Sequence, residues 1–472
     1  MPLARRVTAA ALLAFALVGV TATAASAGWS QPIRFAGPFP VDILPAQISF
    51  SGGGAAAVAY TLQDAGETAV SSSSLVVVRP SPGRPGSPRA VPAALQVLNL
   101  GFAGSLTLLT GTSPSGESCC TAVQLVRLQG GRLTAPQTLL SGLTGGTLAR
   151  FITVDRRRAL AVVATGRGVW VTQSGPLGRF PPVRRLTAPG DRPLTLAAAS
   201  LSGDRTVVAW AAASAPRTIF VATGSRLRGP RRRRAAIVVR SGHDVDELAV
   251  VRGPSQPTIA WIEEWFHRGG YRSQPVVEDL VAHPEAHPFP IGAQDASGLA
   301  FAADGRGDQV ISWEQCGAAG VCDVIAASRP AQGRFGVPQN LGSIDPSQSP
   351  AVTISPRGEA LVGWIHLGQV LVAASARSPV AALRSPRLTT RASSSPPAGP
   401  PAPAPSRSPS SSRSTTSASS PPPPARFGSP AAISRTSLAS DLSLAFGPTG
   451  EALAVWTQGI VAPTLQGAVY RP

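Results

Sequence analysis

The side chains best suited to bind or transform a ligand are concentrated in one segment of the sequence. Four of the five histidines and eight of the 24 acidic residues lie between residues 243 and 287. Within this segment, residues 263–272 read Glu-Glu-Trp-Phe-His-Arg-Gly-Gly-Tyr-Arg. The candidate ligand-binding residues are Glu263, Glu264, Trp265, His267, Tyr271 and Arg272. Carboxylates, an imidazole and aromatic rings in one stretch suit a sugar or a peptide, and paired carboxylates are what glycoside hydrolysis uses.

The arrangement of these residues favours a less specific interpretation over catalysis. Glu263 and Glu264 are adjacent, so on a β-strand their side chains point to opposite faces of the sheet. The simplest interpretation is therefore an elongated hairpin with solvated charges and one aromatic ring against the sheet. Ligand binding is the functional hypothesis, and catalysis is the weaker one.

The sequence contains none of the common motifs of cofactor or nucleophilic chemistry. We find no Gly-x-Ser-x-Gly elbow, no phosphate-binding glycine-rich loop and no dinucleotide fingerprint. All 42 basic residues are arginine, which excludes lysine Schiff-base chemistry. His283 and His287 flank Glu285, but on a loop they lack the fixed geometry of a metal site. We therefore predict no cofactor and no dedicated metal site, and we name no catalytic residue.

The four cysteines suit an oxidising compartment. Cys316 and Cys322 lie six residues apart around a Gly-Ala-Ala-Gly stretch, a spacing that suits a disulfide closing a loop. Cys119 and Cys120 are adjacent, so they form a vicinal disulfide or each pairs elsewhere. Four cysteines allow three pairings, and the sequence does not choose among them.

Residues 1–27 have the pattern of a secretory signal peptide. Arg5 and Arg6 precede a short apolar stretch, and Ala25-Ser26-Ala27 provides small residues for cleavage after Ala27. The apolar stretch is shorter than the ~20 residues that span a bilayer. We therefore predict a freely secreted protein without a transmembrane segment, and its net charge falls from +18 to +16 when Arg5 and Arg6 are removed.

A repeat of about fifty residues organises the mature chain. Tryptophan recurs at positions 210, 261, 313 and 364, and again 92 residues later at position 456. The matching positions earlier in the chain are Val163, Leu109 and Tyr60. Each lies in a short β-type run bounded by Gly and Pro turns. A large side chain at the same position of every unit indicates packing between neighbouring units rather than stacking on a ligand.

A second signature predicts how the ring closes. Arg-Phe-x-x-Pro or a close variant occurs before each clear unit, for example at 179–182, 334–338 and 426–430. A unit of four short strands, A to D from the inside outwards, is a blade of a β-propeller. Strand B contains the tryptophan and strand D the arginine signature. The mature chain then begins with a D strand near 29–35 and ends on a C strand at 467–470, so the N-terminal strand completes the last blade.

The count of units predicts an all-β propeller of eight blades, with seven as the alternative. The pattern resembles secreted bacterial β-propeller repeat proteins of the broad WD-repeat-like and sialidase-like kind. The sialidase-type Asp box, Ser-x-Asp-x-Gly-x-x-Trp, does not occur in the sequence. This departure counts against glycosidase activity.

The predicted domains are a signal peptide at 1–27, blades 1–7 with the closing strand at 28–391, an insert at 392–425 and the last blade at 426–472. The insert is rich in Ser and Pro and has no Val, Leu, Ile or Phe, so it is expected to be disordered. It most easily enters a D–A loop. The B–C loops hold both cysteine pairs, so we expect the insert and the cysteines on one face of the disc.

The composition points to a binding or scaffold protein without naming its ligand. The arginine runs at 156–158 and 231–234 either attract anionic polymers or maintain solubility, and solubility is the simpler reading. No nucleic-acid-binding motif is visible. We therefore predict a monomeric, secreted binding or scaffold module for an extracellular or envelope glycan or protein. The alternatives are a glycan-acting enzyme and a purely structural envelope protein.

Overall fold

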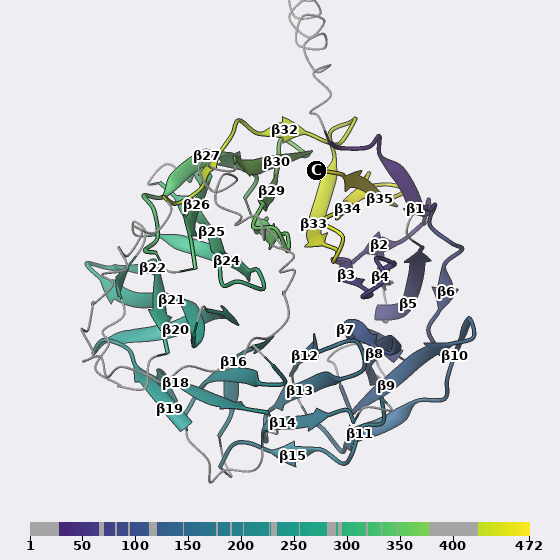
Figure 1. Ribbon diagram of the computed structural model, residues 1–472, viewed down its shortest axis with the longest axis horizontal. Coiled ribbons are helices and arrows are strands. Elements are labelled where there is room, and N and C mark those ends of the chain that lie inside the picture. The colour runs from purple at the N-terminus through teal and green to yellow at the C-terminus, as the bar shows by residue number, and fades with distance from the viewer. Residues whose placement is uncertain are drawn as a thin grey trace, which may run out of the picture.

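A computed structural model describes residues 28–472 apart from 66–69, 81–82, 93–94, 113–119, 145, 176–177, 189–190, 202, 226, 228–233, 254, 281–288, 291–294, 318–319, 332, 347 and 377–422. The described residues form strands and turns without a helix, and so include no helix able to cross a bilayer. Their strands make eight antiparallel sheets arranged as blades around a ring (Figure 1). The prediction of an eight-bladed propeller is confirmed, and the seven-bladed alternative is wrong.

Each blade is one sheet whose innermost strand comes first in sequence. Blade 1 comprises β2 (Asp42–Ile43), β3 (Gln47–Phe50), β4 (Ala56–Ala65), β5 (Val70–Arg79) and β6 (Arg89–Ala90). Blade 2 comprises β7 (Leu95–Ala103), β8 (Ser105–Thr112), β9 (Ala122–Gln129), β10 (Arg132–Leu133) and β11 (Gln137–Ser141). Blade 3 comprises β12 (Thr147–Thr153), β13 (Ala159–Thr165), β14 (Gly168–Gln173) and β15 (Arg184–Arg185). Blade 4 comprises β16 (Pro193–Ser200), β17 (Thr206–Ala212), β18 (Ala215–Gly224) and β19 (Arg234–Val238).

The second half of the ring follows the same plan. Blade 5 comprises β20 (His243–Arg252), β21 (Pro257–His267), β22 (Gly270–Asp279) and β23 (Phe289–Pro290). Blade 6 comprises β24 (Ala296–Ala303), β25 (Gln309–Cys316), β26 (Cys322–Arg329) and β27 (Gln339–Ile344). Blade 7 comprises β28 (Ala351–Ile354), β29 (Ala360–His366), β30 (Gln369–Ala376), β31 (Arg426–Phe427) and β32 (Ala431–Ala432). Blade 8 comprises β33 (Ala439–Phe446), β34 (Ala452–Gln458), β35 (Thr464–Tyr470) and β1 (Ile33–Ala36).

The ring closes through the N-terminal strand, as the sequence predicted. β1 pairs antiparallel with β35, with Ile33 opposite Gly467. Trp29 forms a β-bridge with Tyr470, and their ring centroids lie 5.3 Å apart. The outer strand of the last blade therefore comes from the first described residues of the chain, which leaves no gap between blades 8 and 1.

The repeated tryptophans hold neighbouring blades together. The side chains of Trp210, Trp261, Trp313, Trp364 and Trp456 are fully buried. Each packs in a cluster with apolar residues of the preceding blade. The prediction of core packing is confirmed for these five positions.

Blade 2 departs from the predicted pattern. Leu109, which we matched to the tryptophans, packs in a cluster with residues of the following blade. Its neighbour Leu108 packs toward blade 1 instead. The matched position in blade 2 is therefore one residue off, since Leu108 is the side chain that faces the preceding blade.

The insert lies in a different connection from the one predicted. Residues 426–432 form β31 and β32, which both pair with β30 of blade 7. Strand C of blade 7 therefore ends at Ala376, strand D follows at Arg426, and blade 8 begins at β33. The connection between them is a C–D connection, so the expectation that the insert enters a D–A loop is wrong. Whether the insert and the cysteines share a face is not described, because residues 377–422 and Cys119 lie outside the described residues.

A buried polar network fastens blade 5 to blade 6. Arg329 donates from Nη1 and Nη2 to the two carboxylate oxygens of Asp279, each at 2.7 Å, and from Nη2 to Thr258 Oγ1 at 2.9 Å. Its guanidinium also lies 5.0 Å from the ring centroid of Phe335.

Burial, followed by the charge of Asp279, raises the pKa of the adjacent Glu278 to about 7. Glu278 is therefore largely protonated in mildly acidic solution.

Replacement of Trp261 by Ala should destabilise the propeller by about 3–5 kcal/mol, because it leaves a cavity between blades 4 and 5. The measurement is the free energy of unfolding from urea denaturation of the mature protein. Tyr271→Ala is the control, since this aromatic side chain of the same blade is 72% exposed. It should change stability by about 0.5 kcal/mol or less. Equal losses in the two variants would contradict the assigned packing role.

The raised pKa of Glu278 predicts a pH dependence of stability. A carboxyl whose folded-state pKa exceeds its unfolded value of 4.5 contributes fully below pH 4.5, and its contribution is lost as pH rises through about 7. The thermal unfolding midpoint of the unmodified protein should therefore fall relative to Glu278→Gln between about pH 5 and about pH 8. Parallel pH profiles for the two proteins would refute the burial of an ionisable Glu278.

Candidate ligand-binding site

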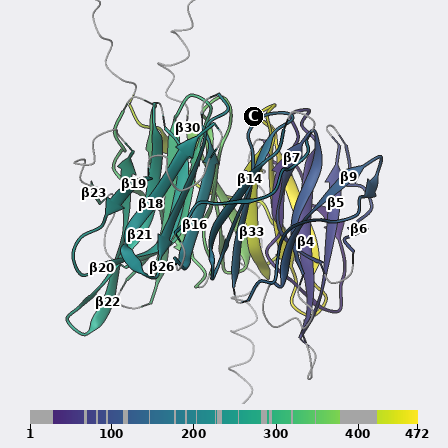
Figure 2. The same cartoon turned by 90° about the horizontal axis from the view of Figure 1, so that it is seen from below.

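The two faces of the disc are built from different connections. One face has the B–C hairpins and the D–A loops, and we call it the B–C face. The other has the A–B turns and the C–D connections, and we call it the A–B face. The predicted site residues lie in the β21–β22 hairpin, a B–C hairpin, and Figure 2 shows blade 5 reaching outward at the lower left of the disc.

A tight turn and a long register explain why the β21–β22 hairpin projects. β21 has 11 residues and β22 has 10, and they pair continuously from Thr258 opposite Asp279 to His267 opposite Gly270. Arg268 and Gly269 connect them with φ values of 48° and 82°. Two consecutive positive φ values are typical of a type I′ turn, whose twist matches that of paired strands. The hairpin is therefore an ordered extension of the sheet.

The hairpin face toward blade 4 is a buried polar anchor. Glu263 is only 1% exposed and accepts a hydrogen bond from Gln274 Nε2 at 3.0 Å. It also accepts one from the backbone N–H of Arg240, in the preceding loop, at 3.4 Å, and His243 Nδ1 lies 3.5 Å from its Oε2. The His243 ring stacks on Trp265 with centroids 4.6 Å apart. Glu263 and Trp265 thus hold the hairpin against its neighbour.

The opposite face of the hairpin gathers carboxylates toward blade 6. Glu264 lies directly across the strand pair from Asp244. Burial, then the charges of Asp246 and Asp244, raise the pKa of Glu264. Glu263 and Glu264 therefore face opposite sides, as predicted, and occupy different electrostatic environments.

Glu247 connects this acidic group to blade 6. Its carboxylate oxygens accept hydrogen bonds from the backbone N–H groups of Gly298 and Leu299 at 2.7 and 2.6 Å. The two amides belong to a bulge in β24, where the register shifts between Ser297 and Ala300. Burial raises the pKa of Glu247 in spite of these bonds. The innermost strands of blades 5 and 6 are thus joined at the B–C end of the central channel.

The tip of the hairpin exposes two aromatic rings. Phe266 is 64% exposed and Tyr271 is 72% exposed, and their centroids lie 5.5 Å apart in an edge-to-face arrangement. His267 is exposed beside them, and Arg272 forms an ion pair with Asp295 of the next loop. Phe266 was missing from the predicted site. The sequence could have indicated Phe266, because a two-residue turn places it directly opposite Tyr271 across the hairpin.

The six predicted residues therefore do not line a single pocket. Glu263, Trp265 and Arg272 are engaged with neighbouring residues, whereas Glu264, His267 and Tyr271 remain accessible to differing degrees. Whether any of them binds a ligand stays a prediction. His283 and His287 lie outside the described residues.

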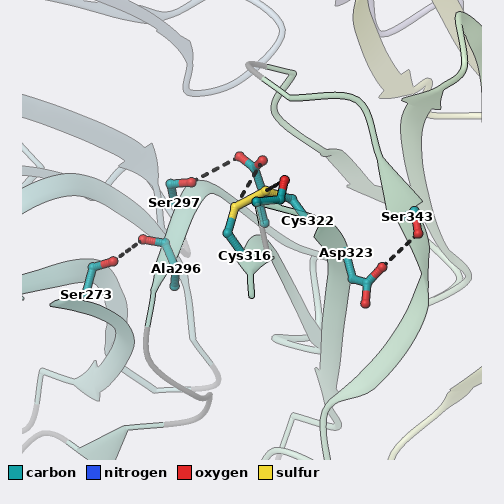
Figure 3. Close-up of a disulfide and its surroundings, with 9 residues drawn as sticks. Ser273, Ala296, Ser297, Cys316, Cys322, Asp323 and Ser343 are labelled. Carbon is teal, nitrogen blue, oxygen red and sulfur yellow. Dashed lines mark hydrogen bonds between the residues drawn. A yellow bond between two sulfur atoms is a disulfide. The ribbon is translucent and has the colours of Figure 1, made fainter. Parts of the chain in front are cut away.

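A disulfide braces the neighbouring hairpin on the same face. Cys316 and Cys322 are bonded and stand opposite each other in β25 and β26, with Cα atoms 4.0 Å apart. Glu314 lies beside them and accepts a hydrogen bond from Ser297 Oγ at 3.0 Å (Figure 3). The disulfide that the six-residue spacing favoured is present, and the structure decides the pairing of these two cysteines, which the sequence had left open. Cys120 is also disulfide-bonded, and Cys119 lies outside the described residues.

Glu314, Cys316 and Cys322 are close enough together to resemble a metal-binding group. Their sulfur atoms are bonded to each other and so provide no thiolate, the form in which cysteine binds a metal. We therefore assign this group a structural role.

Exposed apolar side chains are distributed unequally between the two faces. Eleven large apolar side chains are exposed in the described part of the chain, and ten of them lie on the B–C face. The other, Val337, lies in the C–D connection of blade 6. The ten are Leu148, Leu194, Val238, Phe266, Tyr271, Val321, Leu367, Leu438, Ile460 and Val461. The A–B turns instead contain charged residues such as Arg156, Arg306 and Arg357. The ten apolar side chains are spread over blades 3 to 8, and single exposed apolar side chains are common on protein surfaces. Phe266 and Tyr271 differ because their exposed rings contact each other.

Comparisons with known proteins do not identify a family. No protein-family model and no curated protein sequence matches the chain. Among solved structures, the Dos1 propeller has a TM-score of 0.48 at 11% identity, covering 93% of this chain and 94% of that one. A protein of unknown function from Dyadobacter fermentans has a TM-score of 0.40 at 10% identity, covering 94% and 100%. A prolyl endopeptidase has a TM-score of 0.43 at 13% identity, and the match spans 70% of this chain but only 46% of the peptidase.

The adjacent carboxylates should respond differently to removal. Glu263→Ala should cost about 1–3 kcal/mol, because it leaves the buried Gln274 amide and the Arg240 N–H without their acceptor. Glu264→Ala should be neutral or stabilising near pH 7, because it removes like-charge repulsion with Asp244 and Asp246. Urea denaturation of both variants at one pH checks this pair, and the reverse order would show that the assigned faces are wrong.

Proposed function

We propose that this protein is a monomeric, exported binding module whose B–C face recognises a glycan or protein of the cell envelope or the surrounding medium. The observation that carries the proposal is the exposed aromatic pair of Phe266 and Tyr271 at the tip of an ordered hairpin on that face. Solvent-exposed aromatic rings provide large contact area at low entropic cost. Rigid blades would hold the hairpin ready for contact.

Export of the protein is part of the proposal. The signal-like segment at 1–27 lies outside the described residues. Support comes from the disulfide between Cys316 and Cys322, a bond that persists in oxidising compartments.

The proposal predicts that the aromatic tip is required for binding. The mature protein should be tested on an array of neutral and acidic glycans and for co-sedimentation with envelope fractions of its producing organism. Replacing Phe266 and Tyr271 together by Ser should weaken binding at least about tenfold, as for loss of an interface hot spot. Val337→Ser is the matched control, because this apolar side chain is 87% exposed away from the B–C face.

Two outcomes would overturn the proposal. One is the absence of binding by the unmodified protein to every glycan and envelope fraction. The other is equal binding by the unmodified protein and the double variant, at equal unfolding midpoints.

One observation favours a second candidate, a glycan-acting enzyme. Glycoside hydrolysis needs one carboxyl with a raised pKa near another that stays ionised. Glu264, with its raised pKa, lies near Asp244 and Asp246. Release of reducing ends from any bound glycan, abolished by Glu264→Gln, would support this candidate, and release that survives the substitution would exclude this acid from catalysis.

A further inference from the structure

A separate cavity opens on the A–B face between blades 3 and 4. Its volume is about 570 Å³, within the range of small-molecule sites. Its walls come from the A–B turns and C–D connections of both blades, including Arg158 and Arg179 of blade 3 and Asp204 and Leu227 of blade 4. It is independent of the aromatic hairpin, which lies in blade 5 on the other face.

The cavity has an excess of positive charge. Arg158 is engaged by Asp155 at 2.6 Å and by Asp204 at 3.3 Å. Arg179 and Arg184 also line the cavity, are exposed, and have no salt bridge to any described residue. Among the described lining residues, the carboxylate of Asp204 therefore accompanies three guanidinium groups. A guanidinium offers a planar fork of donors that matches a carboxylate.

A fourth arginine adds to this excess of positive charge. Arg127 lies in an adjoining cavity that shares Arg179 and Phe180 with the first. Burial, then the charge of Arg179, lowers the pKa of Arg127. A bound anion beside Arg179 would offset the repulsion between these two cations.

The apolar lining of the cavity indicates which kind of surface a ligand would have beside its anionic group. Pro181 and Pro182 line the cavity and are exposed, so their rings provide apolar surface that a ligand can touch.

We propose that this cavity binds a carboxylated sugar. Its carboxylate would lie between Arg179 and Arg184, and the C–H face of the ring would contact Pro181 and Pro182. A uronate unit has both features. The proposal does not depend on the function assigned to the B–C face.

The test is isothermal titration calorimetry of the mature protein, residues 28–472, at low salt. The probes are digalacturonate, the neutral disaccharide galactobiose, and inorganic phosphate. Digalacturonate should bind at least about tenfold more tightly than either other probe, and salt should weaken it by screening. Arg179→Gln and Arg184→Gln should each weaken it at least about tenfold, as for the loss of a charge-assisted pair.

Arg357→Gln is the matched control. It removes the same charge from an exposed A–B turn of blade 7, distant from the cavity in the ring, and should leave binding unchanged. Equal affinity for galactobiose would overturn the role of the anion, and equal affinity for phosphate would overturn the sugar. Absence of digalacturonate binding, or an equal effect of Arg357→Gln, would refute the site. Unfolding midpoints of all variants establish that losses arise from binding.

Discussion

The pairing of β1 with β35 is the constraint on which the rest of the structure depends. Each blade buries both faces of its sheet against its neighbours, so an open ring would expose two apolar faces. Closure buries these faces, and β1 covers the outer edge of β35. The buried contact between Arg79 and Glu451, 2.8 Å apart, adds a polar link between blades 1 and 8 at the same junction.

Closure separates the parts of the chain that must be alike from those that are free to differ. The five buried tryptophans occupy equivalent places because the space between adjacent sheets is similar around the ring. The loops have no such requirement, and they differ in length and chemistry. One face gathers apolar side chains, and the other has arginine-containing turns beside a cavity between blades 3 and 4. Function is expected in loops held by a rigid scaffold.

Blade 5 shows how neighbouring residues acquire opposite roles. Glu263 is enclosed by Gln274 and the loop from blade 4, and it anchors the hairpin. Glu264 faces two other carboxylates and gains no hydrogen-bond partner from the described residues. The difference follows from the alternation of side chains along β21, because each face of this strand meets a different neighbouring blade.

The sequence by itself favoured eight blades over seven and indicated the closing strand, because both follow from repeats along the chain. The six-residue spacing favoured a Cys316–Cys322 disulfide but left three pairings of the four cysteines open. The sequence also determined that Glu263 and Glu264 face apart. Only the tertiary structure decided which of the two is buried, that Phe266 joins Tyr271 at the tip, and that residues 426–432 return to blade 7. Likewise, Arg158 and Asp204 meet across a blade junction. Contacts between blades depend on side chains about fifty residues apart, and no local pattern in a single sequence records which of them will meet.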